Sequence, residues 1–221
     1  MTKPETESEP SPIAGLHADD IEVHQGSKSL LPRTTLALHP GEVAVVRGGP
    51  GSAHTALALA LAGRLPLDVG QVSLDGDQRP GTLQRAVAIV DAPGVTEPDD
   101  GVPLHTIVGE EMAMAGQRAR RSDVRRLLAD EGLAGHRDSP MDEVPVALRI
   151  GALARLAASR PGVGYVVLTL PERHGLPPTQ WLDLARSLAD KGSGVLVTAS
   201  AAVDLPPDVP VFTLGPEEAS R

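Results

Sequence analysis

Residues 48–55 read Gly-Gly-Pro-Gly-Ser-Ala-His-Thr, and this glycine-rich stretch decides the fold. It follows an apolar, valine-rich run over residues 42–47 and leads into a run of helix formers over residues 55–63. A buried strand, a tight glycine loop and a helix, in that order, are the context of a phosphate-binding loop, in which backbone N–H groups face an anion at the helix N-terminus. We therefore expect a strand, loop and helix unit at this point of the chain.

The loop departs from a working phosphate loop in its side chains. The motif G-x-x-x-x-G-K-[ST] uses a lysine to neutralise the terminal phosphates and a hydroxyl to hold magnesium. Thr55 keeps the hydroxyl, but Ala53 replaces the second motif glycine and His54 replaces the lysine. An imidazole is shorter than a lysine side chain and mostly neutral near pH 7, so the electrostatic contribution is weakened. The candidate binding residues of this loop are Gly48, Gly49, Gly51, Ser52, Ala53, His54 and Thr55.

Composition excludes several classes of protein. The chain has 221 residues, a formal net charge of −9 and no cysteine, so disulfides and thiolate metal sites are ruled out. Nucleic-acid binding is disfavoured, because it needs clustered basic residues and aromatic stacking platforms, and the chain has one Trp, one Tyr and one Phe. One basic cluster has helical spacing beside acidic residues, which favours a solvated helix face over a binding patch. It consists of Arg118, Arg120, Arg121, Arg125 and Arg126.

The sequence predicts no membrane span of its own. No apolar run reaches the roughly 18 residues that a spanning helix needs, and the N-terminus has no apolar signal region. We expect a cytoplasmic protein that reaches the inner face of the cell membrane through a partner. Residues 1–14 and 216–221 are polar and charged, which predicts disordered tails.

The order of predicted elements indicates an α/β fold. Residues 21–24 and 35–38 alternate apolar and polar side chains around a turn, which predicts a small antiparallel β element at the N-terminus. Later strands alternate with helices, which predicts a mainly parallel sheet in a three-layer arrangement. Helices over residues 102–116 and 122–134 would form an insert lobe. The other predicted strands are 71–74, 86–90, 164–170, 194–198 and 209–214, and the other helices are 146–159 and 178–190.

Six further segments accompany the glycine-rich loop in a fixed order and spacing: Leu36-Ala37-Leu38-His39-Pro40-Gly41-Glu42, Leu61-Ala62-Gly63, Gly70-Gln71-Val72-Ser73-Leu74-Asp75-Gly76, Leu153-Ala154-Arg155, Pro161 to Pro171 and Gly194 to Thr198. In these segments, over roughly residues 16–215, the chain resembles the ATP-binding subunits of ABC transporters. The resemblance implies a P-loop NTPase-like three-layer sandwich over residues 15–215 with a helical insert at about 95–145. It also implies ATP and magnesium as cofactors, for which we expect weak affinity, and a membrane permease as the partner that faces the helical lobe.

The positions that carry chemistry in that family hold other residues here. The glutamine that senses magnesium and the membrane partner corresponds to Asp91, whose carboxylate would repel phosphate unless a metal lay between them. The aromatic that stacks on adenine corresponds to Gln25, and the switch histidine to Ala199. The family signature L-S-G-G-Q corresponds to Glu143 to Ala147, which retains neither its serine nor its glycines.

The strand that should carry two catalytic carboxylates carries none. By resemblance, Thr169 stands in place of the aspartate that holds magnesium, and Leu170 in place of the glutamate that activates water. Glu172 is a weak candidate for a displaced base, because Pro171 stops the strand before it. Since phosphoryl transfer depends on positioned charges, we assign no catalytic residue and expect turnover near background. The seven histidines show no metal-binding spacing, so we assign no metal site.

Three functions follow from these observations. The first is a degenerate coupling or regulatory subunit beside a permease and, in a heteromeric complex, an intact ATPase subunit. The second is an atypical subunit that still binds or hydrolyses ATP with help from a partner. The third is a soluble interaction protein that reuses the scaffold, with an anion pocket at His54 that strengthens as the imidazole gains a proton.

Overall fold

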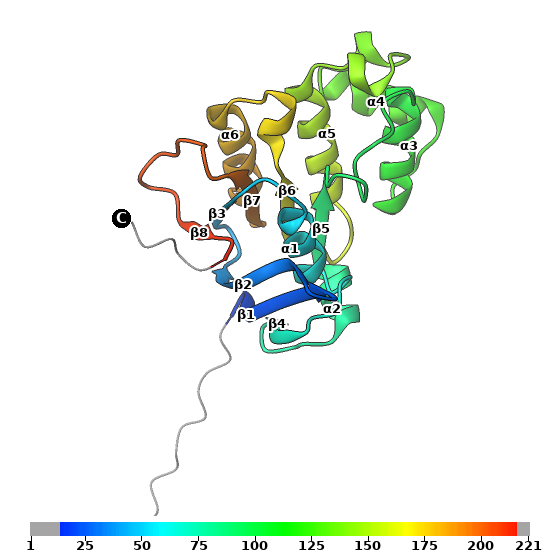
Figure 1. Ribbon diagram of the computed structural model, residues 1–221. Coiled ribbons are helices and arrows are strands. Elements are labelled where there is room, and N and C mark those ends of the chain that lie inside the picture. Colours follow the sequence, from blue (N-terminus) through cyan, green and yellow to red (C-terminus); the bar gives the residue numbers. More distant parts are fainter. Residues whose placement is uncertain (1–13, 216–221) are drawn as a thin grey trace, which may run out of the picture.

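The computed structural model describes residues 14–215, and a five-stranded parallel sheet lies at its centre (Figure 1). The strand order is β5-β6-β7-β3-β8, and every neighbouring pair is parallel. All but β8 are apolar and largely buried, as expected for strands covered on both faces. Their bounds are Val43–Gly48 (β3), Val87–Val90 (β5), Tyr165–Thr169 (β6), Gly194–Ser200 (β7) and Val211–Thr213 (β8).

A second, antiparallel sheet contains the N-terminal strands. Its order is β2-β1-β4, so the predicted N-terminal antiparallel element is confirmed, with longer strands and with β4 added to it. Gly26 sits at the β1–β2 turn with φ +60°, a conformation that glycine adopts readily. The bounds are Leu16–Gln25 (β1), Lys28–Leu38 (β2) and Val69–Leu74 (β4).

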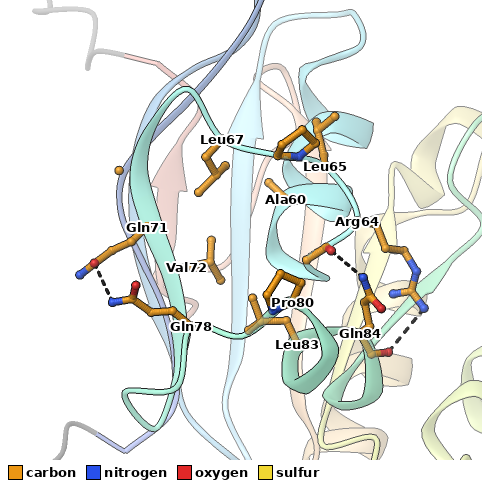
Figure 2. Close-up of a pocket in the computed structure, with 13 residues that line it drawn as sticks. Ala60, Arg64, Leu65, Leu67, Gln71, Val72, Gln78, Pro80, Leu83 and Gln84 are labelled. Carbon is orange, nitrogen blue, oxygen red and sulfur yellow. Dashed lines mark hydrogen bonds between the residues drawn. The ribbon is translucent and has the colours of Figure 1, made fainter.

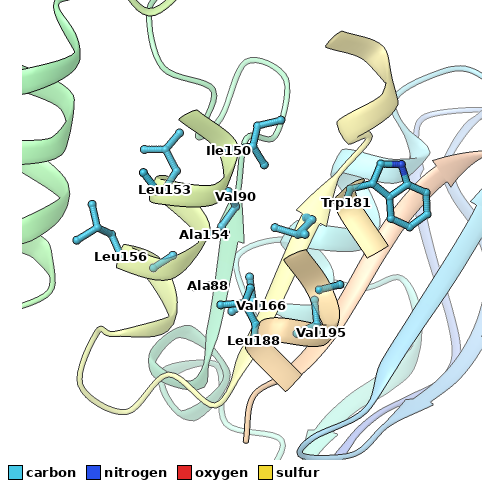
Figure 3. Packing of buried hydrophobic residues seen from close by; sticks show 14 of the residues in the cluster. Ala88, Val90, Ile150, Leu153, Ala154, Leu156, Val166, Trp181, Leu188 and Val195 are labelled. Carbon is cyan, nitrogen blue, oxygen red and sulfur yellow. The ribbon is translucent and has the colours of Figure 1, made fainter. Parts of the chain in front are cut away.

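Helices separate the two sheets and cover the far face of the parallel sheet, which gives the predicted three layers. Helices α1 and α2 lie on the side of the antiparallel sheet, and α5 and α6 lie on the other side (Figure 1). Successive strand residues alternate between the two cores, as Val45 and Val46 of β3 do. Figure 3 shows the α5 and α6 side, where Trp181 and Leu188 pack against the sheet. The helices are Ala53–Leu61 (α1), Pro80–Ala86 (α2), Val146–Ala158 (α5) and Pro178–Ala189 (α6).

Two further helices form a lobe beyond the end of α5 (Figure 1). They pack through apolar residues on one face of each, among them Val108, Val124 and Leu128. Among residues 14–215 no helix is long and apolar enough to cross a membrane. The lobe helices are Leu104–Met114 (α3) and Arg121–Asp130 (α4), and three short 3₁₀ helices are Ala134–His136 (η1), Met141–Glu143 (η2) and Pro171–His174 (η3).

Two differences from the sequence prediction affect the site. Helix α1 begins at Ala53, two residues earlier than predicted, so His54 belongs to the first helical turn rather than to the loop. Helix α2 was not predicted, because seven residues are too few to display a helical period and Pro80 at its start suggests a turn. The predicted tails, 1–14 and 216–221, fall outside the described residues except for Ala14.

Candidate functional site

The carboxyl ends of four parallel strands bring the predicted site residues to one edge of the sheet. Gly48 at the end of β3 pairs with Ser200 of β7, and Thr169 of β6 pairs with Thr198 of β7. Strand β5 ends beside β6, so the loop that begins at Asp91 leaves the same edge. Ligands of open parallel sheets bind in the crevice outside such carboxyl ends. The topology therefore gathers the positions that the sequence analysis singled out, apart from Gln25 and residues 143–147.

The glycines of the loop have different structural roles. A Cβ on Gly48 would lie 2.7 Å from the side chain of Leu214, so glycine is required there for packing. A Cβ on Gly49 or Gly51 would meet no atom within 4 Å, so the space above this part of the loop is open. Gly51 has φ +142°, which favours glycine. The loop thus keeps an open backbone cradle in front of α1.

The helix that follows the loop begins without a side-chain cap. The carbonyl of Ser52 accepts a hydrogen bond from Ala56 at 2.9 Å, while the Ser52 hydroxyl makes no capping bond. Ala53 and Thr55 are half-buried in the first turn. The amino end of α1 therefore carries the positive end of its dipole next to the open side of Gly49 and Gly51.

His54 turns back onto the loop instead of extending from it. Its side chain is fully buried, and Nε2 lies 3.0 Å from the carbonyl oxygen of Gly49, to which it donates its hydrogen. Nδ1 is buried and makes no hydrogen bond within the described residues. Burial lowers the pKa of the imidazole below its usual value, although the Gly49 carbonyl and the charge of Glu172 act in the opposite direction. At neutral pH His54 is therefore an uncharged group held by the loop backbone.

The end of β6 bends sharply at Leu170. This residue has φ +48° and ψ +54°, a left-handed conformation that is unfavourable for leucine, and its N–H lies 3.0 Å from the carbonyl of Thr198. Thr169 is buried, and its hydroxyl makes no hydrogen bond within residues 14–215. As the sequence predicted, the strand does not continue past Pro171. Neither side chain at this strand end supplies a charge.

Glu172 also lies at this edge of the sheet, although it follows β6 and is not part of the strand. It lies in η3, and its Oε1 accepts a hydrogen bond from the backbone N–H of Ser200 at 2.6 Å. Its Oε2 is buried and makes no hydrogen bond within the described chain. Its charge acts to raise the pKa of His54, against the effect of burial. A carboxylate therefore does lie at this edge of the sheet. It is hydrogen-bonded to the end of β7 and is not part of strand β6.

Asp91 is the centre of a buried charged network. It has φ +58° and is 5% exposed. Arg173 contacts it twice, through Nη2 at 3.2 Å from Oδ1 and Nη1 at 2.5 Å from the backbone carbonyl. Arg173 also donates to the carbonyl of Thr169 at 2.8 Å and to Glu97 at 2.9 Å. One guanidinium thus joins the ends of β5 and β6 to the loop that follows β5.

A histidine and a second arginine complete this network. Arg149 of α5, 7% exposed, donates to Nδ1 of His174 at 3.1 Å and to the carbonyl of Met141 at 2.8 Å. Because Nδ1 accepts that bond, Nε2 of His174 carries the hydrogen, and it lies 3.0 Å from Oδ2 of Asp91. Burial raises the pKa of Asp91, while Arg173 and His174 oppose that shift. The Asp91 network comprises Asp91, Glu97, Arg149, Arg173 and His174.

Three members of the Asp91 network have the donor types of a metal site. Ligand atoms of Asp91, Glu97 and His174 lie within 4.8 Å of one another. A cation on Nε2 of His174 would require the hydrogen to move to Nδ1, which faces the N–H of Arg149. Arg173 already supplies positive charge to both carboxylates. The group is therefore better suited to an internal ion network than to holding a cation.

The sequence analysis singled out Asp91 by resemblance but missed its partners. Arg173 and His174 follow the strand end by a few residues, and a charged pair next to a buried strand is the signal that could have identified them. Arg149 gave no such signal, because it lies in an Ala and Leu-rich helix. Gln25 is exposed at the end of β1, and residues 143–147 span the end of η2 and the start of α5.

A separate hollow of about 430 Å³ lies at the other end of α1 (Figure 2). Its polar side chains are largely bonded to their neighbours: Gln78 donates to Gln71 at 2.8 Å, and Gln84 donates to the carbonyl of Gly63 at 2.9 Å. Leu67 and Val72 give it apolar walls. It shares no residue with the edge that holds His54 and Asp91.

Solved structures share this fold. A nucleotide-free ATP-binding cassette from an ABC transporter superposes with a TM-score of 0.66 at 14% identity and covers 92% of this chain and 88% of its own. The cbiO1 protein of Clostridium perfringens, part of the ABC transporter complex cbiONQ, gives a TM-score of 0.66 at 15% identity over 91% of this chain and 85% of its own. These similarities confirm the predicted P-loop NTPase-like fold.

Sequence comparison finds relatives of this chain, although no model of a known protein family matches it. The hemin import ATP-binding protein HmuV of Pseudomonas fluorescens (strain Pf0-1) is 30% identical over 200 residues, which cover 82% of this chain and 75% of the relative. The Fe(3+) ions import ATP-binding protein FbpC of Streptomyces coelicolor is 31% identical over 126 residues, 56% of this chain and 36% of that protein. Given the HmuV match and the shared fold, this chain belongs to the family of ABC transporter ATP-binding proteins.

Proposed function

We propose that this chain is a coupling or regulatory subunit of a membrane transporter complex, with impaired nucleotide chemistry. In this proposal residues 15–215 are one ABC ATPase-like domain with a helical insert at about 95–145. The loop residues Gly48, Gly49, Gly51, Ser52, Ala53, His54 and Thr55 form a degenerate phosphate loop, which would bind ATP and magnesium weakly.

The observation that carries the proposal is the pair of side chains beside the loop. His54 is buried and neutral at the position where the terminal phosphates require a cation, and Glu172 adds a negative charge near it. Two negative groups in a site of low dielectric repel each other more strongly than in water. The open backbone at Gly49 and Gly51 leaves room for a phosphate. The side chains of His54 and Glu172, in contrast, disfavour a triphosphate.

The set of residues that would hold magnesium is also incomplete. Thr55 retains a hydroxyl in the first turn of α1, but Thr169 and Leu170 supply no carboxylate at the end of β6. Glu172 is already bonded through Oε1 to the Ser200 N–H. Because the metal and the base provide most of the catalysis of phosphoryl transfer, this residue set does not fit a hydrolytic magnesium site.

A groove beside Asp91 supports the proposed partnership with a permease. It has a volume of about 320 Å³ and lies between the end of β5, α3 and α5, with Val90, Leu153 and Ala157 among its lining residues. Val95 and Met114 also line it and are 47% and 56% exposed, so two exposed apolar side chains share one groove. We propose that this permease groove receives an apolar segment of the membrane partner.

The names of the relatives suggest the direction of transport. HmuV and FbpC are named as import ATP-binding proteins for hemin and Fe(3+) ions. We propose by analogy that the partner permease of this chain belongs to an importer, in which an intact ATPase subunit supplies the hydrolysis.

Co-purification with the permease tests this function. The tagged chain is expected to retain a multi-span membrane protein in mild detergent, and Val95→Glu/Met114→Glu is expected to release it. Val69→Glu/Val211→Glu is a matched control, because those valines are 41% and 39% exposed on other parts of the surface. Capture of no membrane partner by the wild-type chain, or equal capture by both double variants, would contradict the proposal.

A second candidate function is an atypical ATP-binding subunit. The open space at Gly49 and Gly51, the positive end of α1 and the hydroxyl of Thr55 favour it, since these groups could still receive phosphate. Calorimetry with Mg-ATP distinguishes the two functions. Saturable binding at micromolar nucleotide that Thr55→Ala abolishes would favour this second function over the first.

A further inference from the structure

A second groove lies in the helical lobe, between α3 and α4. It has a volume of about 310 Å³, and its walls are small and apolar at Gly109 and Ala113 of α3, Ala119, and Val124 of α4. Arg121 and Arg137 add positive charge to its lining. We call this hollow the α3–α4 groove.

Part of the basic cluster of the sequence lies at this groove: Arg121 lines it, and Arg125 follows one helical turn later on α4. Arg118, Arg120, Arg121 and Arg125 are exposed, and none makes an ion pair within residues 14–215. Arg121 and Arg125 are one helical turn apart and flank Val124, which forms the wall. Arg118 lines a different hollow, beside Asp123, Asp130 and Glu131, so Arg121 and Arg125 are the arginines that concern this groove. Their exposure fits the solvated helix face that the sequence predicted, and the apolar groove beside Arg121 is an additional feature.

Acidic side chains offset part of the positive charge at the groove. Glu110 lines it, and His105 and Arg137 both lie 3.4 Å from Asp138. The amino end of α4 points its helix dipole toward the same side as Arg120 and Arg121. Arg121 and the neighbouring Arg125 are therefore the unpaired positive charges at this groove, and they favour a negatively charged partner.

The α3–α4 groove is separate from the permease groove. His105, Gly109 and Ala113 follow one another at four-residue spacing and share one face of α3. Glu111 and Met114, which line the permease groove, lie on the roughly opposite face at 3.6 residues per turn. One helix thus presents two binding surfaces, and each can be altered without changing the other.

We propose that the α3–α4 groove docks an acidic segment of a partner protein that carries at least one apolar side chain. The apolar side chain would occupy the space at Gly109 and Ala113, and its carboxylates would pair with Arg121 and Arg125. A concave apolar groove has no complement on the flat surface of an anionic bilayer, so we favour a protein segment over a membrane. This surface is distinct from the contact with the permease and does not depend on nucleotide binding.

Fluorescence polarisation with synthetic peptides tests the proposal. The probe is a labelled peptide of about twelve residues, rich in glutamate, with two leucines at i and i+4 spacing. We expect it to bind the full-length chain saturably, and to bind less tightly as salt is raised. The same peptide with alanine in place of leucine is expected to bind about tenfold more weakly. Absence of saturable binding up to about 1 mM peptide would overturn the proposal.

Three variants separate the contributions of charge and shape. Arg121→Glu/Arg125→Glu is expected to weaken binding at least about tenfold, and Ala113→Trp, which fills the groove, by a similar factor. Lys28→Glu/Lys191→Glu makes the same change in net charge at exposed positions elsewhere, and binding is expected to stay within about twofold. Circular dichroism melts check that each variant is folded. If the arginine variant and the lysine variant lose affinity equally, the binding is nonspecific and the proposal is wrong.

Vesicles containing phosphatidylserine distinguish the membrane alternative. The proposal predicts that Ala113→Trp reduces peptide binding and that the wild-type chain binds vesicles no better than Arg121→Glu/Arg125→Glu does. Strong vesicle binding that requires these arginines and persists in Ala113→Trp would assign the surface to a membrane instead.

Discussion

The phosphate loop and the Asp91 network lie at the same edge of the sheet but depend on different interactions. Around His54 the backbone geometry persists, with an open cradle and a helix start, while the side chains are neutral or negative. Around Asp91 the charged side chains are buried and pair with one another across three elements. Packing therefore maintains the shape of the phosphate loop without charged side chains, whereas ion pairs between loops maintain the Asp91 network.

This difference has a mechanical consequence for the lobe. Arg173 joins the end of β5 to Thr169 and Glu97, and Arg149 of α5 joins the same network through His174. Hydrogen bonds between protein groups thereby fix the loop that leads to α3 to the parallel sheet. Such a fixed connection suits a subunit that transmits the state of its neighbours.

The largest effect is expected from breaking the Asp91 network. Arg173→Ala leaves a buried carboxylate without its main partner, so we expect a loss of about 3 kcal/mol in the free energy of unfolding, measured with urea. Arg186→Ala removes an exposed pair with Asp208 and should cost less than about 1 kcal/mol. Equal losses in the two variants would show that the Asp91 network does not stabilise this edge.

A smaller effect is expected at the outer arginine of the network. Arg149→Met keeps the length and apolar contacts of the side chain but removes the donors to His174 and to the carbonyl of Met141. We expect a loss of about 2 kcal/mol, because buried acceptors remain unsatisfied. Nitrogen chemical shifts of the His174 ring give a second measurement, since Nδ1 loses its donor in the variant. Unchanged shifts would contradict the assigned tautomer.

The phosphate loop is tested by restoring charge rather than removing it. His54→Lys combined with Glu172→Gln supplies a cation and removes the nearby anion, so we expect Mg-ATP affinity to rise at least about tenfold by calorimetry. His54→Gln combined with Glu172→Gln controls for the loss of the carboxylate alone. If both double variants bind ATP equally, the missing cation is not what limits affinity.

The smallest effect is a pH dependence of stability. Burial lowers the pKa of His54 in the folded chain, so below about pH 6.5 the unfolded chain binds more protons and stability falls as pH decreases. Urea unfolding at pH 7.5 and 5.5 should therefore show a loss in the wild type that exceeds the loss in His54→Gln by up to about 1 kcal/mol. Asp91, whose pKa is raised, contributes a slope of opposite sign, but it is present in both proteins and cancels. An equal or steeper loss in His54→Gln would contradict the buried neutral imidazole.

Local sequence patterns predicted most of the fold. The valine-rich run before Gly48 and the alternation in residues 21–24 reflect burial on two faces and on one face, and both strands appear in the structure. Helix α2 was not predicted, because its seven residues are too few to show the hydrophobic period of a helix. The loop residues were predicted from a motif, but the inward turn of His54 was not, since it depends on the burial that the fold creates.

The partners of Asp91 could not be predicted from local patterns. Arg149 and Arg173 approach it from α5 and η3, which are far from it in the chain, and contacts of that kind are set by the packing of the layers. The contact of Glu172 with Ser200 could not be predicted from local patterns either. As predicted, the strand does not continue past Pro171, but the bend at Leu170 brings the Glu172 carboxylate back to the N–H of Ser200.

The most direct test of the central claim is release of phosphate from labelled ATP by the purified chain, at saturating nucleotide with excess magnesium. The proposed function predicts no release above buffer, and no difference between the wild type and Thr55→Ala. Phosphate release by the wild type that Thr55→Ala or Glu172→Gln abolishes would contradict it and would show that this loop still supports hydrolysis.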